Sequence, residues 1–190
     1  MYRFLFISLL PLLAWTFFRE DQKYLEIITR DEWQALPPRG NIPNINSPSL
    51  NIIVSDTATD PCFNKASCSK ICREIQETSF LKGFPDIPYN FLIGSDGLIY
   101  EGRGWNKQND GIGNEAIEIT FIGNFNTDLP PSNSVDAFNL LLKTGIRSNL
   151  VFQSYNLFGR RQIDNGNRPG NAFYNLIQKW EHWFPKFCRL

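Results

Sequence analysis

The sequence predicts an α/β domain built on a single mixed central β-sheet flanked by about three helices. Short strand-like apolar runs alternate with helical segments along the chain, which is typical of such a domain. The 190 residues suit one domain, and 42% of them are apolar, including 16 Phe. This composition is sufficient for a hydrophobic core, and we find no repeat and no interdomain linker.

The N-terminus carries the pattern of a targeting segment. Arg3 precedes an apolar stretch over residues 4–18, and charged residues follow at once. A short basic start and an apolar run of this length fit a secretory signal, whereas a spanning helix usually needs about 20 apolar residues. We therefore expect a signal peptide or an uncleaved signal anchor over 1–18, with a buried N-terminal helix as a third reading. A short linker over 19–25 then leads to the domain at 26–188.

The strands are predicted from apolar, β-branched runs bounded by turn residues. A hairpin is expected around Ser95-Asp96-Gly97, because Asp-Gly suits a tight turn between two strands. The expected strands cover residues 26–28, 50–54, 89–94, 98–101 and 116–125.

The helices are predicted from apolar spacing and start signals. Ser67 is the expected cap of a helix over 67–80, and a second helix over 134–146 follows Pro130-Pro131. A third is expected over 171–184, where five apolar side chains share one stripe that we interpret as core packing: Phe173, Leu176, Ile177, Trp180 and Trp183.

Charge and histidine content exclude several function classes. Nineteen basic residues balance nineteen acidic ones with no basic run, which argues against a nucleic-acid partner. The single histidine excludes any metal site that needs two imidazoles.

The four cysteines indicate disulfide chemistry. Cys62 and Cys68 flank a short polar loop, which suits a local disulfide in an exported protein. Cys72 and Cys188 are left to pair with each other or to stay free. The spacing is a poor match to the paired knuckles of a zinc site.

Several blocks, in the right order along the chain, resemble one known family. The most specific is Tyr89–Gly97 running into Tyr100–Asn106, and Ile28–Trp33, Phe121–Phe125 and Tyr155–Gly159 continue the resemblance. Residues 26–187 thus resemble the peptidoglycan recognition protein family, the animal relatives of bacteriophage-type zinc N-acetylmuramoyl-L-alanine amidases.

The resemblance implies a site for zinc that this chain has lost. Catalytic members hold the metal with two His and one Cys, and a metal-bound water hydrolyses the amide between muramic acid and the first L-Ala of the stem peptide. The matching positions here are Ser55, Arg160 and Arg168, while the helper Tyr89 remains. Two guanidinium groups would repel a dication, so we expect no metal, no cofactor and no enzyme activity. A residual amidase is only a remote alternative.

The resemblance also implies a groove for peptidoglycan fragments. Gly83, Phe84 and Arg103 partly match the signature of relatives that prefer diaminopimelate-type stems, because an Arg fork suits the extra carboxylate. Tyr89 is expected on the groove floor, or only within the sheet, and Trp105 in a wall. The alternative for Arg103 is a solvent-exposed cation that does not bind the ligand. The full set of expected peptidoglycan-binding residues is Thr57, Gly83, Phe84, Tyr89, Arg103, Trp105 and Asn106.

These expectations define the predicted function. The chain would be a non-catalytic innate-immune protein that binds bacterial peptidoglycan, preferentially of the diaminopimelate type. The alternative is a co-receptor, regulator or decoy that binds another peptidoglycan recognition protein without binding muropeptide itself. Either protein would be secreted, or anchored to the membrane only through its N-terminal segment.

Overall fold

The computed structural model describes residues 25–110, 112–114 and 116–187. The predicted targeting segment 1–18, most of the predicted linker and Cys188 lie outside the described residues. No helix in the described ranges has the length and apolar character that crossing a membrane requires.

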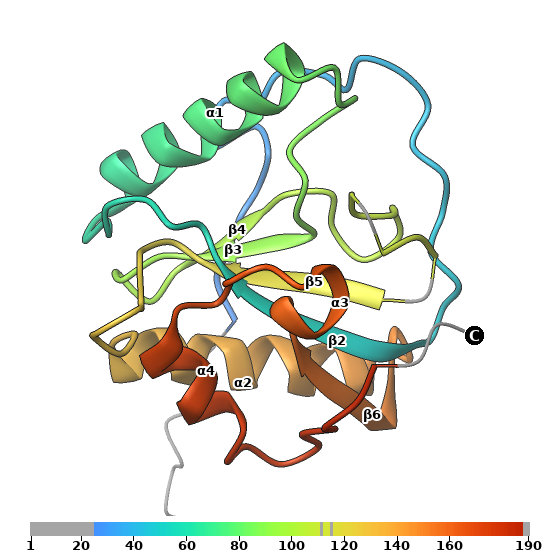
Figure 1. Ribbon diagram of the computed structural model, residues 1–190. Coiled ribbons are helices and arrows are strands. Elements are labelled where there is room, and N and C mark those ends of the chain that lie inside the picture. The colour runs from blue at the N-terminus through green and yellow to red at the C-terminus, as the bar shows by residue number, and fades with distance from the viewer. Residues whose placement is uncertain (1–24, 111, 115, 188–190) are drawn as a thin grey trace, which may run out of the picture.

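A six-stranded mixed sheet forms the centre of the domain, as predicted (Figure 1). Its order is β1-β4-β3-β5-β2-β6, and only the β3/β4 pair is antiparallel. The strands are β1 Ile27–Ile28, β2 Ser49–Asp56, β3 Phe91–Ile93, β4 Ile99–Glu101, β5 Ala116–Phe121 and β6 Val151–Gly159.

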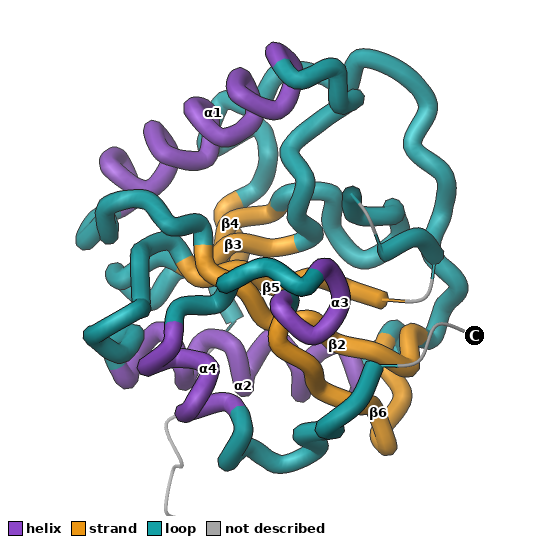
Figure 2. Tube along the Cα trace, in the orientation of Figure 1, coloured by secondary structure: helices purple, strands orange, loops and turns teal. Residues whose placement is uncertain are grey.

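Helices cover both faces of this sheet. They are α1 Lys65–Leu81, α2 Ser132–Arg147, the single-turn α3 Arg161–Asp164, and α4 Asn171–Ile177. Helix α1 lies on one side of the sheet, and α2 and α4 lie on the other (Figures 1 and 2). Side chains alternate between the two faces along each strand. In β3, Phe91 and Ile93 therefore join the core under α2 and α4, while Leu92 joins the core under α1.

The predicted hairpin is confirmed at the end of β3. Phe91 pairs with Glu101 and Ile93 with Ile99. Gly97 has φ +80°, a conformation that favours glycine, and the Asp96 carboxylate accepts a hydrogen bond from the Leu98 amide at 3.0 Å.

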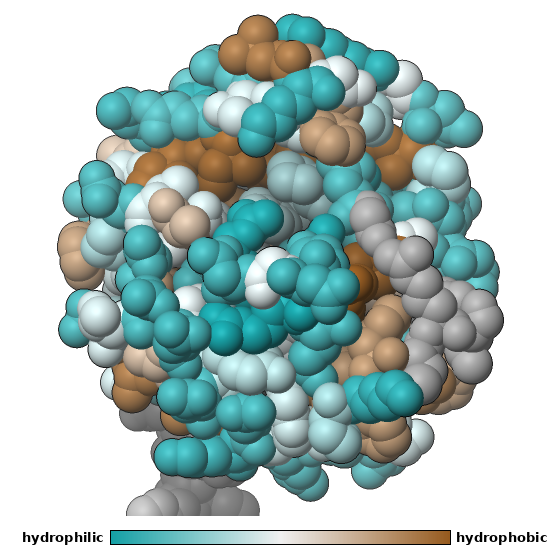
Figure 3. Space-filling model, viewed as in Figure 1, coloured by the Kyte–Doolittle hydropathy of each residue, from teal (hydrophilic) through white to brown (hydrophobic). Residues whose placement is uncertain are grey.

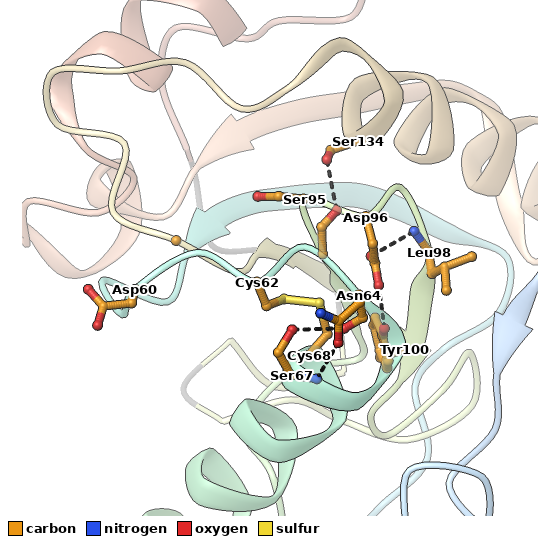
Figure 4. The surroundings of a disulfide bond; sticks show 12 residues. Asp60, Cys62, Asn64, Ser67, Cys68, Ser95, Asp96, Leu98, Tyr100 and Ser134 are labelled. Carbon is orange, nitrogen blue, oxygen red and sulfur yellow. Dashed lines mark hydrogen bonds between the residues drawn. A yellow bond between two sulfur atoms is a disulfide. The ribbon is translucent and has the colours of Figure 1, made fainter.

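The predicted disulfide is confirmed, and it holds the first turn of α1 (Figure 4). The predicted cap is wrong by three residues. Asn64 is the N-cap, and its side-chain oxygen accepts a hydrogen bond from the Ser67 amide at 2.9 Å. Asn is as good a cap as Ser, so the helix begins where the side-chain acceptor first becomes available. Cys72 is a free, buried cysteine within α1.

The predicted C-terminal helix is too long. Helix α4 ends at Ile177, and the Lys179 and Trp180 amides then bond carbonyls only three residues back. His182 takes a left-handed φ of 67°, and its carbonyl accepts from the Leu157 amide of β6. The chain leaves the helix to follow this strand. The aromatic stripe still packs on the core, as predicted.

One strand end differs by several residues from the prediction, and two elements were not predicted. Strand β5 stops at Phe121 rather than residue 125, since Gly123 has φ +152° and the Phe125 amide turns to the Asp56 carboxylate. Strand β6 was not predicted, because residues 152–154 are exposed and the polar Gln153 and Ser154 interrupt its apolar pattern, and neither was the single turn of α3.

Candidate ligand-binding groove

A groove of about 670 Å³ lies beneath α1 on the sheet's α1 side. Ile71 and Ile75 of α1 contribute apolar lining, and Tyr89, Arg160 and Arg168 also line the groove. Figure 3 shows this hollow, with apolar surface along the α1 side and hydrophilic surface toward α3. Its volume suits a small ligand of drug-like size.

The structure brings half of the predicted site residues to this groove. Thr57, Phe84, Tyr89, Arg160 and Arg168 line it. Phe84 is 44% exposed, whereas Tyr89 is 6% exposed. The five others, Ser55, Gly83, Arg103, Trp105 and Asn106, are not among its lining residues.

Behind the groove wall lies a buried ion pair that was not among the predicted site features. The Glu118 carboxylate in β5 accepts from Arg160 Nη1 at 2.6 Å and from Ser55 Oγ at 2.9 Å. Arg160 also donates to Asp164 at 2.9 Å. The signal was available, because Glu118 is a charged residue between two isoleucines of a predicted strand, and it is 1% exposed.

The electrostatics of this pair favour its charged form. Burial acts to lower the pKa of Arg160, but Glu118 and Asp164 outweigh it, so the net shift is upward. Burial raises the pKa of Glu118, against the effects of Arg160 and Ser55. We take the pair as ionised, since a guanidinium stays protonated in proteins and lies in direct contact with the carboxylate.

A second cation lies beside the tyrosine of the groove. Arg168 Nη1 donates to Tyr89 Oη at 3.1 Å. Burial raises the pKa of Tyr89, and Arg168 opposes that shift only in part. The phenol therefore keeps its proton at neutral pH and can donate a hydrogen bond into the groove.

These residues do not fit a zinc ion. The positions that the sequence resemblance matches to metal ligands carry a serine hydroxyl that donates to Glu118 and two guanidinium groups, none of which is a zinc donor. Nor do the described ranges contain a group of three or more His, Cys, Asp or Glu side chains that could hold a metal.

Arg103 is a structural residue in this conformation. Its side chain is 2% exposed and forms an ion pair with Asp110 at 2.8 Å. Its guanidinium also donates to the carbonyls of Ile87, Gln108 and Asp86. The solvated-cation alternative is wrong. Asp110, a lining residue of the groove, pairs with the Arg103 guanidinium, which the prediction assigned to a ligand carboxylate.

The other predicted residues lie around the groove's margins or away from it. Trp105 packs on Phe91, with ring centroids 4.6 Å apart, in the core on the α2 side, so it is not a groove wall. The Asn106 carbonyl accepts from the Ile45 amide, and Gly83 follows the end of α1 with φ +83°.

Comparison with known proteins identifies the family. Residues 46–171 match the N-acetylmuramoyl-L-alanine amidase family. A peptidoglycan-recognition protein of Drosophila simulans is 37% identical over 164 residues, covering 85% of this chain and 90% of that protein. Mouse peptidoglycan recognition protein 1 is 36% identical, covering 83% and 88%. The chain belongs to the peptidoglycan-recognition protein family.

Solved structures of the peptidoglycan-recognition proteins share its fold. The Drosophila protein SD superimposes with a TM-score of 0.83 at 34% identity, covering 86% of this chain and 99% of that one. A complex of the LCa and LCx ectodomains with tracheal cytotoxin matches at 0.82 and 34% identity, covering 84% and 99%. Protein LE, in complex with the same monomeric diaminopimelic acid-type peptidoglycan, matches at 0.81 and 31%, covering 83% and 95%.

Proposed function

We propose that this chain is a non-catalytic, exported peptidoglycan-recognition protein of innate immunity that binds muropeptides in the groove beneath α1. The observation that carries the proposal is the groove itself, with Phe84 exposed on its lining and Thr57, Tyr89 and Arg168 as polar lining residues. Structures of similar chains, LE and the LCa–LCx pair, hold tracheal cytotoxin, which supports the ligand class. The Cys62–Cys68 disulfide supports an oxidising, extracytoplasmic compartment.

A calorimetric titration of the purified protein with a muropeptide tests the proposal. Phe84→Ala removes an exposed groove ring and is expected to weaken binding at least several-fold. Phe63→Ala is the matched control, because Phe63 is 68% exposed and is not a lining residue. No heat at millimolar ligand, or equal weakening by both substitutions, would count against the groove as the site.

Preference for diaminopimelate-type stems is the finer part of the proposal. It rests on Gly83 and Phe84 at the groove margin and on Arg103 behind it. A ligand carboxylate can reach Arg103 only by replacing Asp110, which holds it at 2.8 Å. Asp110→Asn is therefore expected to raise affinity for diaminopimelate-type muropeptide but not for the lysine-type one. If the affinities for both muropeptides changed equally, Arg103 would not determine the preference between them.

The loss of amidase activity is proposed from the same residues. Arg160 and Arg168 bring cations to positions where a zinc ligand would be needed, and Arg160 is held there by Glu118. Metal analysis of protein purified with added zinc is expected to find no stoichiometric zinc. Stoichiometric zinc, together with release of stem peptides that begin with L-Ala, would contradict this proposal and show that the protein is an amidase.

A second candidate is a co-receptor that binds another family member. The similar LCa and LCx ectodomains form a complex with each other to which tracheal cytotoxin is bound, which favours this possibility. Muropeptide binding that appears only when a second recognition protein is present would select it over direct recognition.

A further inference from the structure

The charged side chains lining the groove are mostly paired. Lys70 pairs with Glu74 at 3.4 Å, Arg160 with Glu118 at 2.6 Å, and Asp110 with Arg103 at 2.8 Å. Over the part of the chain that the structure describes, this leaves Lys82, Arg168 and Asp60 as lining residues without an ion pair. Of the two unpaired cations, Lys82 is exposed where α1 ends, whereas Arg168 is half-buried.

Arg168 has N–H donors that no described residue uses. Its side chain forms one hydrogen bond among the described residues, from Nη1 to Tyr89 Oη, although a guanidinium carries five N–H donors. Glu118 and Asp164 lie close enough to interact with Arg168 electrostatically, but both are in direct contact with Arg160. The remaining N–H groups of Arg168 are thus available to a ligand in the groove.

Tyr89 completes a pair of donors. Its oxygen accepts from Arg168, so its own O–H is free to point at a third atom. Burial raises the pKa of this phenol and so keeps it protonated. A guanidinium N–H and a phenol O–H, anchored to each other at 3.1 Å, suit one acceptor group that carries two oxygens and a negative charge.

We infer that Arg168 and Tyr89 form a carboxylate-binding subsite in the groove, so that this protein prefers muropeptides with a free carboxylate at that point over their neutral amides. The inference rests on the proposed function and narrows its ligand class. Two kinds of carboxylate in peptidoglycan fragments have the required chemistry. One is the lactyl carboxylate of muramic acid, which is free only after hydrolysis of its amide bond to L-Ala. The other kind is a free carboxylate of the peptide, such as the two of a terminal D-glutamate.

Two matched ligand pairs distinguish these sources. N-acetylmuramic acid and its lactyl amide differ only in the charge of the lactyl group. N-acetylmuramoyl-L-alanyl-D-glutamate and its diamide differ only in the charge of the peptide. Charge-assisted hydrogen bonds are roughly twice as strong as neutral ones, so the acid of one pair should bind about tenfold or more tightly than its amide. Calorimetry or ligand-detected NMR measures both ratios.

Variants then assign the preference to its residues. Arg168→Gln is expected to bring the acid-to-amide ratio close to one, and Tyr89→Phe to reduce it. Lys82→Gln removes the other unpaired cation of the lining and should leave the ratio unchanged. Arg168→Lys, which keeps the charge without the fork, should retain part of the ratio, and thermal unfolding of each variant checks that it folds.

Several results would overturn the subsite. They are equal binding of acid and amide by the wild-type protein in both pairs, or a ratio that survives in Arg168→Gln. Binding of a larger muropeptide with no acid preference would reject the subsite and leave the proposed function standing. Absence of binding to every ligand, the larger muropeptide included, would reject both.

Discussion

Glu118 and Arg160 form a buried ion pair between the central sheet and the groove. Glu118 is 1% exposed inside β5, and Arg160 enters from the end of β6 to meet it. A buried carboxylate is costly unless a cation and hydrogen bonds compensate it, and here Arg160 and Ser55 supply both. The pair is therefore expected to matter for folding even though it lies at the proposed binding site.

Removing one partner should cost far more than removing both. Glu118→Leu leaves the Arg160 charge with Asp164 alone and should lower the free energy of unfolding by about 3 kcal/mol. Glu118→Leu with Arg160→Met replaces the pair by apolar groups and should recover most of that loss. Lys70→Gln, which breaks an exposed pair, should change it by less than about 1 kcal/mol. Urea unfolding measures all three, and a loss in the double variant as large as that in Glu118→Leu alone would contradict this interpretation.

Tyr155 should make stability sensitive to alkaline pH. Burial, and then Glu181, raise its pKa to about 12, above the value of about 10 in an unfolded chain. Between these values the folded state holds a proton that the unfolded state has released, so stability falls as pH rises through this window. Tyr155→Phe keeps the ring that stacks on His182 and should flatten the fall. Unfolding midpoints at pH 8 and pH 11 test this, and equal slopes for both proteins would exclude Tyr155 as the cause.

At the scale of elements, the start of α1 is defined by side-chain chemistry. Asn64 accepts from the Ser67 amide, and the first turn contains no acidic residue. Asn64→Ala should lower the free energy of unfolding by about 1 kcal/mol, while Asn64→Asp should preserve it, because a carboxylate also suits the positive end of the helix. Thermal or urea unfolding gives the comparison. A larger loss from Ser67→Ala than from Asn64→Ala would return the capping role to Ser67.

The elements that the sequence predicted well are those whose signals are local. The β3/β4 hairpin follows from Asp96-Gly97, and β2 from the consecutive β-branched apolar residues Ile52–Val54. Strand β6 escaped prediction because its middle is polar and its place depends on pairing with β2, about a hundred residues away in sequence. The end of α4 escaped because a bond from Leu157 to the His182 carbonyl, not a local stop signal, draws the chain off the helix.

The candidate site divides along the same line. Residue-by-residue comparison with the family correctly assigned five residues to the groove: Thr57, Phe84, Tyr89, Arg160 and Arg168. The resemblance did not predict the ion-pair partners of two arginines. Asp110 pairs with Arg103, and Glu118 pairs with Arg160. Both contacts join segments that are distant in sequence or lie in irregular loops, so their geometry depends on the assembled sheet.

At the scale of the whole molecule, the two largest hydrophobic cores among the described residues lie on opposite faces of one sheet. Trp33 is fully buried in the core under α1, where its indole N–H donates to the Glu101 carbonyl at 2.8 Å. Phe173 is fully buried in the core under α2 and α4, with its ring 4.7 Å from that of Phe121. Because alternate residues of β3 enter opposite cores, neither core can lose its packing without disturbing the strand that supports the other.

The shared sheet predicts one cooperative unfolding transition. Trp33→Phe and Phe173→Leu should each lower the free energy of unfolding by about 1–3 kcal/mol and shift a single urea transition. Hydrogen exchange followed by mass spectrometry provides the readout for each layer. Peptides from α1 and from α2 should lose protection together in both variants, since global opening exposes both layers at once. Faster exchange confined to the layer that carries the substitution would show that the two cores open independently. The groove beneath α1 would then be able to change shape without the rest of the sheet.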